Sequence, residues 1–251
     1  MKIIRFSADD EIQYGIIEGE EITVIDGEPY GGIKITVGSY RLSEVKLLAP
    51  CQPSKIVALG VNYRRHAEEM GSSLPKAPLI FIKPSTCVIG PEDNIVYPPS
   101  SVRVDFEGEL GVVIGKTARN VSEAEALNYV LGYTCLNDVT ARDLQESDGQ
   151  WTRSKGFDTF GPIGPCIETV LDPTDAKLET YLNGELKQQT STSDLIYPVV
   201  TQISFISEVM TLLPGDVIAT GTPSGIGPMN PGDTVEVKIE SIGTLRNYVL
   251  K

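Results

Sequence analysis

Short apolar runs separated by turn residues occupy the first 48 residues. The segments KIIRF, YGIIEG, EITVID and KITVG are rich in β-branched and aromatic residues and are bounded by Gly, Asp and Pro. Such runs between turn signals are typical of short strands, so the pattern predicts a small β appendage over residues 1–48. The proline-containing segment LLAPCQPSK then leads into a main domain over residues 49–251.

The main domain is predicted to consist largely of strands. KIVALGVN, PLIFIKPST and LGYTCLND have the apolar character of buried strands, and FEGELGVVIGK predicts a long strand that starts at Phe106. KLETYLNGELKQ predicts a hairpin around Asn183-Gly184, because that dipeptide favours a tight turn. Pro-Gly-Asp occurs at 214–216 and at 231–233, and each copy precedes a predicted strand, VIATG and TVEVKI.

Few helices are predicted. VSEAEALNYV is expected to be helical with Ser122 as its cap, and a second helix is expected to open at Thr140 with Asp143 completing a capping box. RRHAEEMG predicts one or two helical turns, and TQISFISEVMTLL predicts a further helix. The fold class is therefore α+β, mainly β, with strands that close into a roll.

The net charge of the chain disfavours some classes of binding partner. The chain has 34 acidic and 21 basic side chains, a formal net charge of −13. This surplus argues against nucleic acid and against an anionic membrane surface, since phosphate binding relies on clustered Lys and Arg. The N-terminus has no apolar core of signal-peptide length, so we expect a reduced, cytoplasmic protein. The scattered cysteines are expected to be core residues: Cys51, Cys87, Cys135 and Cys166.

The segment DFEGELGVVIG, residues 105–115, carries the first candidate chemistry. Alternate side chains of a strand share a face, so Asp105, Glu107 and Glu109 are predicted to point the same way where the strand enters the core. Asp138, at the end of the next predicted strand, is the candidate third ligand of an oxygen-only site for Mg²⁺, Mn²⁺ or Ca²⁺. The alternatives are a solvated acidic edge and, for Asp138, a turn or capping aspartate.

His66 is the only histidine in the chain, so any imidazole acid–base chemistry must use it. Glu69 lies three residues later, where a carboxylate on a helical turn can orient the ring. The alternative is an exposed histidine in a charged surface turn. A zinc site of several histidines is excluded, because the chain has no second one.

Seven ordered segments resemble the fumarylacetoacetate hydrolase family over nearly all of residues 50–250. They are GVNYRRHAEE, PLIFIKPST, VDFEGELGVVIGK, LGYTCLNDVTARDLQ, QWTRSKGFDTFGPIGP, LLPGDVIATGTPSGIG and PGDTVEVKIESIG. The resemblance implies a β-roll catalytic domain, a homodimer and a divalent ion, Mg²⁺ or Mn²⁺. It places that ion on Glu107, Glu109 and Asp138.

The resemblance also implies residue roles. His66 and Glu69 would form a water-activating dyad, and Lys155 would stabilise developing negative charge. The substrate site would include Arg142, Gln145 and Thr222. Taken on their sequence context alone, Lys155 could equally be a loop lysine, and Arg142 a surface residue paired with Glu146 at i+4.

These roles lead to three functional hypotheses. The first is a metal-dependent hydrolase that cleaves a C–C bond in a 1,3-diketo acid of the acylpyruvate or fumarylpyruvate type through an enolate held by the ion. The second is an isomerase or decarboxylase of 2-oxo or 2-hydroxydienoate dicarboxylates, such as hydroxyheptadienedioate or oxaloacetate. The third is a scaffold without chemistry. In the first two, the partner is a small anionic 2-oxo acid.

Overall fold

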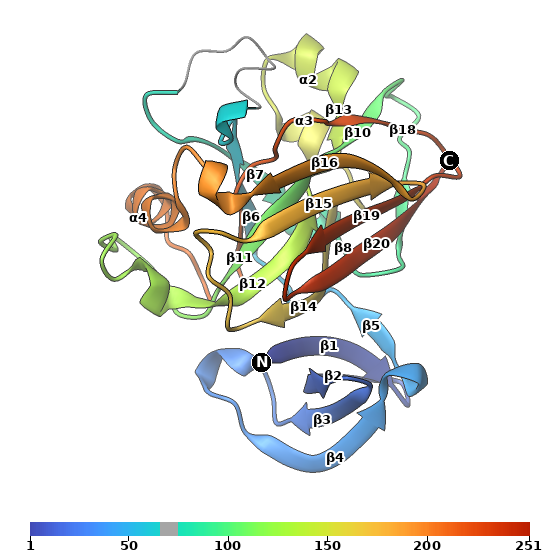
Figure 1. Cartoon of the computed structure of the whole chain (residues 1–251), viewed down its shortest axis with the longest axis vertical. Helices are drawn as coiled ribbons and strands as arrows, with labels where there is room; N and C mark the ends of the chain where they lie inside the picture. Colours follow the sequence, from blue (N-terminus) through green and yellow to red (C-terminus); the bar gives the residue numbers. More distant parts are fainter. Residues whose placement is uncertain (66–74) are drawn as a thin grey trace.

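A computed structural model of the protein describes residues 1–65 and 75–251 (Figure 1). The strands are β1 (Lys2–Ala8), β2 (Glu11–Glu18), β3 (Glu21–Ile25), β4 (Ile35–Arg41), β5 (Lys46–Leu48), β6 (Lys55–Gly60), β7 (Leu79–Pro84), β8 (Val88–Ile89), β9 (Asn94–Val96), β10 (Val104–Phe106), β11 (Gly108–Ile114), β12 (Val130–Asn137), β13 (Thr140–Ala141), β14 (Gly161–Glu168), β15 (Lys177–Leu182), β16 (Glu185–Ser191), β17 (Val217–Ala219), β18 (Gly227–Met229), β19 (Thr234–Ile239) and β20 (Gly243–Leu250). The α-helices are α2 (Arg142–Asp148), α3 (Thr152–Lys155) and α4 (Val199–Val209). Short 3₁₀ turns are η1 (Pro29–Gly31), η2 (Leu42–Glu44), η3 (Ser85–Cys87), η4 (Ala126–Tyr129) and η5 (Thr192–Asp194). The α+β, mainly β prediction is confirmed.

A large sheet organises the molecule. Its strands follow the order β4-β3-β2-β1-β14-β12-β11-β17-β6-β7, and β5 pairs with β1. A five-stranded sheet, β16-β15-β19-β20-β9, covers part of one face, and a three-stranded sheet, β13-β10-β18, lies near α2 and α3 (Figure 1). The N-terminal strands join the large sheet through β1 and β14, where Ile3 is registered with Ile167.

Strand β11 is buried on both faces, and its alternation sets the two cores. Leu110 and Val112 pack in the cluster that also contains residues of α4 and of the five-stranded sheet. Val113 points the other way, into a cluster with Ile56 and Val217. This alternation agrees with the faces predicted from the sequence. The four cysteines are free and buried, as predicted.

The predicted strand from Phe106 is interrupted at Glu107, which corrects the sequence analysis. The Glu107 N–H donates to Asn137 Oδ1 (2.9 Å), and the Gly108 N–H donates to Gln188 Oε1 (2.9 Å). Side chains therefore take the hydrogen bonds that a neighbouring strand would otherwise make at this point. As a result, Phe106 packs in the same cluster as Val113.

One helix prediction was wrong. The segment after Ser122 forms only the turn η4, because the carbonyl of Tyr129 accepts from the Gly115 N–H (2.7 Å) and β12 begins at the next residue. The Ser122 hydroxyl bonds the Glu125 carboxylate instead of capping a helix. The hairpin at Asn183-Gly184 and the helix α4 were predicted correctly.

The capping box at Thr140 is also absent. Helix α2 begins at Arg142, and the Thr140 hydroxyl lies 2.8 Å from the Asp138 carbonyl and 3.1 Å from Glu107 Oε1. The Asp143 carboxylate accepts from Ser101 Oγ (2.6 Å). Both side chains are thus engaged by residues outside the helix, which local sequence does not reveal. No helix within the described residues is long and apolar enough to span a membrane.

The two Pro-Gly-Asp turns differ in burial, and this difference generates a stability prediction. Asp216 is fully buried and accepts from Ser54 N and Oγ (3.0 and 2.6 Å), Lys55 N (3.2 Å) and Leu213 N (2.9 Å), and it pairs with the Lys55 ammonium. Asp233 is partly exposed and accepts from Asn183 Nδ2 and Asn230 N.

We predict that Asp216→Ala lowers the free energy of unfolding by about 3–5 kcal/mol, because it leaves several buried donors and a cation unpaired. The matched variant Asp233→Ala should cost only about 1 kcal/mol. Urea denaturation of both variants measures the difference, and equal losses would contradict this account.

Candidate metal centre and cavity

The three predicted metal ligands meet at one end of the large sheet. Glu107 lies in the break between β10 and β11, Glu109 on β11, and Asp138 just after β12. The antiparallel register pairs Gly108 with Asn137, and the Asp138 N–H donates to the Glu107 carbonyl (2.8 Å). One carboxylate oxygen from each of the three acids lies within 4.8 Å of the other two, and all three side chains are buried.

Cations compensate two of these three carboxylates. Lys155 Nζ lies 2.8 Å from Glu107 Oε2 and 2.6 Å from Asp138 Oδ2. Lys83 Nζ, fully buried, lies 2.6 Å from Asp138 Oδ1. Arg142 pairs with Glu107 Oε1. Among the described residues, Glu109 has no cation partner and accepts a hydrogen bond only from the Gly221 N–H (2.7 Å).

The pKa values follow from this pattern. Burial opposes ionisation of Glu107, but the charges of Lys155 and Arg142 outweigh it and lower its pKa to about 2. Burial and the charges of Asp138 and Glu107 raise the pKa of Glu109 well above its usual range. Burial also disfavours the ammonium of Lys155, yet Asp138 and Glu107 raise its pKa, so this side chain stays protonated.

The donor set fits a hard divalent cation. All three side chains offer carboxylate oxygens, the ligands that Mg²⁺ and Mn²⁺ prefer. Three buried carboxylates repel one another, and this repulsion adds to burial in raising the pKa of Glu109. A divalent ion held by Glu107, Glu109 and Asp138 would relieve it.

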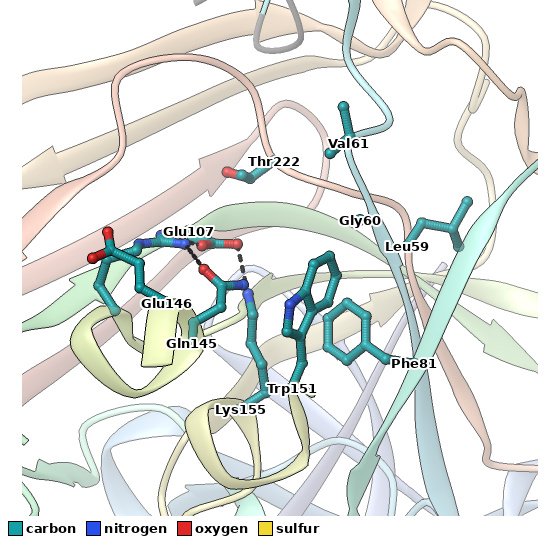
Figure 2. Close-up of a pocket in the computed structure, with 11 residues that line it drawn as sticks. Leu59, Gly60, Val61, Phe81, Glu107, Gln145, Glu146, Trp151, Lys155 and Thr222 are labelled. Carbon is teal, nitrogen blue, oxygen red and sulfur yellow. Dashed lines mark hydrogen bonds and ion pairs between the residues drawn. The ribbon is translucent and has the colours of Figure 1, made fainter. Parts of the chain in front are cut away.

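A cavity of about 260 Å³ opens beside the acids. Figure 2 shows Glu107, Gln145 and Lys155 toward one side and the rings of Phe81 and Trp151 toward the other. The two rings contact edge to face, with centroids 5.1 Å apart. The cavity therefore has charged residues next to the acidic centre and an aromatic part beside them, with Lys155 Nζ 5.3 Å from the centroid of the Phe81 ring. Its lining residues are Leu59, Gly60, Val61, Phe81, Glu107, Arg142, Gln145, Glu146, Trp151, Lys155 and Thr222.

Helix α2 brings Arg142 and Gln145 to the cavity, as the resemblance implies. Arg142 pairs with Asp105 (Nε to Oδ2, 3.0 Å) and with Glu107, rather than with Glu146 on its own helix. It also donates to Gln145 Oε1, and the Gln145 amide nitrogen makes no hydrogen bond within the described part of the chain. Asp105 thus lies on the Arg142 side of the site and is not one of the three clustered acids.

Thr222 lines the cavity, but its hydroxyl is engaged by the protein. It donates to the Gly108 carbonyl (3.0 Å) and accepts from Gln188 Nε2 (2.8 Å). Gln188 also accepts from the Gly108 N–H. This network fixes the backbone between Glu107 and Glu109. The predicted dyad of His66 and Glu69 lies outside the described residues.

Sequence reasoning missed Lys83 and the aromatic pair of Phe81 and Trp151. Lys83 is the one charged residue in the apolar strand PLIFIKP, and a lysine in such a strand needs a buried acid as partner. That mismatch was the available signal. The aromatic contact gave no signal, because Trp151 is brought to β7 only by the tertiary fold; a side chain on Gly60 would collide with its ring at 2.5 Å.

The comparison with family models decides the classification. A model described as fumarylacetoacetate (FAA) hydrolase, C-terminal, matches residues 55–250. The chain belongs to the fumarylacetoacetate hydrolase family. A second model, described as Rv2993c-like, N-terminal, matches residues 1–50.

Similar proteins in this family carry isomerase, tautomerase and hydrolase names. The 2-hydroxyhepta-2,4-diene-1,7-dioate isomerase of Mycobacterium marinum is 46% identical, with a TM-score of 0.94 over 100% of this chain and 98% of that one. A fumarylacetoacetate hydrolase of Exiguobacterium antarcticum is 37% identical, with a TM-score of 0.90 over 100% and 99%. A mitochondrial oxaloacetate tautomerase of Rattus norvegicus is 39% identical over 220 residues, 83% of this chain and 70% of that protein.

Glu109 is repelled by the two neighbouring carboxylates and has no cation partner in the described residues, which leads to a prediction about metal binding. Glu109→Gln should reduce Mn²⁺ affinity by more than the roughly 10–100-fold typical of residues that only support a ligand. Isothermal titration with Mn²⁺ measures it, and Glu146→Gln, which removes an acid from the same cavity, should bind like the wild type. Unchanged affinity in Glu109→Gln would remove this residue from the ligand set.

The buried pair of Lys83 and Asp138 generates a stability prediction. Lys83→Met should lower the free energy of unfolding by about 3–5 kcal/mol, since Asp138 loses one of its two cations inside the protein. Lys46→Met breaks the exposed pair with Asp93 and should cost at most about 1 kcal/mol. Chemical denaturation of metal-free protein checks both values; a small loss for Lys83→Met would contradict the compensating role.

Proposed function

We propose that this protein is a divalent-metal-dependent enzyme that converts small 2-oxo carboxylates through an enolate. The observation that carries the proposal is a cluster of three buried acids at the edge of a cavity that is lined by one of them, Glu107, together with Lys155, Arg142 and Gln145. When bound, the divalent ion, Mg²⁺ or Mn²⁺, supplies Lewis-acid polarisation of the substrate oxygens.

The chain's own residues supply charge and orientation. Lys155 holds a full positive charge between Glu107 and Asp138 and lines the cavity, so it can stabilise a developing enolate oxygen. Because its pKa is raised, Lys155 is suited to donating hydrogen bonds and not to removing a proton at neutral pH.

Other residues that line the cavity would orient the substrate. The Gln145 amide nitrogen is available to donate to a substrate oxygen, and Arg142 adds positive charge beside it. The rings of Phe81 and Trp151 offer an apolar surface for the substrate chain. A 2-oxo acid with a planar tail matches this division between a charged head and an apolar body.

Isomerisation or tautomerisation is the reaction type that similarity supports most strongly. The isomerase of M. marinum matches along the whole chain at 46% identity, and the rat protein at 39% is an oxaloacetate tautomerase. Such reactions need an enolate and a proton carrier. Decarboxylation of oxaloacetate would instead break the C3–C4 bond, release CO₂ and leave the enolate of pyruvate, which takes up a proton; it needs the same stabilisation of negative charge on the 2-oxo oxygen.

C–C bond hydrolysis of a 1,3-diketo acid is the second candidate. It is supported by the 37% identity to the fumarylacetoacetate hydrolase of E. antarcticum and by the presence of His66 and Glu69 in the sequence. In this reaction the dyad would deprotonate water, which adds to the distal carbonyl. The C–C bond then breaks to give a carboxylate and an enolate that takes up a proton.

A substrate panel tests the proposal. The Mg²⁺-loaded protein is incubated in D₂O with oxaloacetate, hydroxyheptadienedioate and acetylpyruvate, and products are followed by NMR. Deuterium exchange at C3 or a moved double bond identifies proton transfer, and acetate with pyruvate from acetylpyruvate identifies hydrolysis. We expect proton transfer with at least one substrate; no exchange and no cleavage with any of them would overturn the proposal.

Two variants test two different steps: stabilisation of the enolate, which both reactions need, and activation of water, which only hydrolysis needs. Lys155→Met should lower kcat by about 10²–10³-fold for either reaction, the size expected for loss of an oxyanion donor, whereas exposed Lys116→Met should not. His66→Ala should abolish hydrolysis if water is activated there. Full activity in Lys155→Met would contradict its role.

A further inference from the structure

A second charged cavity lies in the N-terminal region. Arg5 is on β1, between its registered neighbours Tyr14 on β2 and Leu48 on β5. Its side chain is only 8% exposed. Figure 1 places these strands at the opposite end of the molecule from α2 and α3, so this cavity is separate from the one beside the clustered acids.

Arg5 differs from the other buried charges. Within the described residues, it makes no hydrogen bond and no ion pair, although it is the residue type with the most donors. Every other buried charged side chain there has at least one such partner: Lys83, Asp105, Glu107, Glu109, Asp138, Lys155, Glu168, Glu179 and Asp216. No Arg5 nitrogen is among the fully buried polar atoms that lack a partner, so its free donors still reach solvent although the residue as a whole is largely buried. Free guanidinium donors in such a place are available to a ligand.

Arg5 lines a cavity of about 410 Å³. Gln13, Gln52 and Tyr14 are polar residues that line it, and Ile12 and Ile25 contribute an apolar part. Glu28 also lines this cavity, but it forms no ion pair with Arg5. Burial raises the pKa of the nearby Cys51 thiol to about 12, and the charge of Arg5 opposes the rise. Arg5 is thus a positive charge without a hydrogen-bond or ion-pair partner in the described residues, and it lines a space large enough for a small molecule.

We propose that this cavity binds a small monocarboxylate through Arg5. A planar guanidinium matches a carboxylate with two parallel hydrogen bonds. One cation beside the acid Glu28 suits a single negative charge better than a phosphate dianion, and the isoleucines suit a short apolar tail. A ligand of this cavity does not need a 2-oxo group to chelate a metal ion, because none of the three clustered acids lines the cavity.

Butyrate is the probe that tests the site. It has one carboxylate, a short tail and no 2-oxo group to chelate a metal at the acidic centre. Metal-free protein is titrated with sodium butyrate at constant ionic strength, and the shift in Tm gives Kd. We expect Arg5→Gln to raise Kd about tenfold or more, which corresponds to about 1.4 kcal/mol. Lys34→Gln removes an exposed charge of the same region and should leave Kd unchanged.

Glu28→Gln tests the same site independently, even if the Arg5→Gln variant does not fold. Glu28 is exposed, and its removal should lower Kd for butyrate, because a repelling charge leaves the cavity. Turnover of the 2-oxo acid should stay at the wild-type level in both variants. The proposal is overturned if wild-type protein shows no butyrate-dependent shift, if Arg5→Gln keeps it, if Glu28→Gln does not tighten binding, or if phosphate binds more tightly than butyrate.

Discussion

Three carboxylates that converge inside a protein repel one another, and the structure around Glu107, Glu109 and Asp138 is arranged to withstand that repulsion. Lys83 and Lys155 share Asp138, and Lys155 and Arg142 share Glu107. These cations come from β7, α3 and α2, so the packing of both helices against the sheet depends on the same charges. Glu109 has only a backbone donor in the described part of the chain, which leaves it the acid most in need of a further positive charge.

Under the proposed function, this arrangement would let one centre serve several reactions. Tautomerisation, decarboxylation and C–C hydrolysis of 2-oxo acids all pass through negative charge on an oxygen next to a carboxylate. The clustered acids, Lys155 and Arg142 address that shared requirement. The differences lie in which group moves a proton or activates water, and in which tail fits against Phe81 and Trp151. Similar chains with isomerase and hydrolase names are consistent with that division.

The sequence predicted those features that depend on local periodicity. The alternation of β11, the hairpin at Asn183-Gly184 and the clustering of the three acids follow from strand geometry and from the resemblance. The break at Glu107 did not follow, because the side chains that cause it, Asn137 and Gln188, are 30 and 80 residues distant from their partners. Lys155 and Arg142 likewise have local readings as surface residues, and only the fold shows which acids they meet.

The same rule of charge compensation gives opposite results at the two ends of the molecule. Among residues 1–65 and 75–251, every cation at the acidic centre has a partner and Glu109 has only a backbone donor, whereas Arg5 at the N-terminal cavity has no hydrogen-bond or ion-pair partner. Stability alone favours neither state, because burying an unpaired charge always costs free energy. Binding can offset that cost, since a ligand of opposite charge recovers the lost interaction when it enters. The protein partners of each group therefore indicate the charge of a suitable ligand: Glu109, which accepts only the Gly221 N–H in the described residues, favours a cation, and the cavity lined by Arg5 favours an anion.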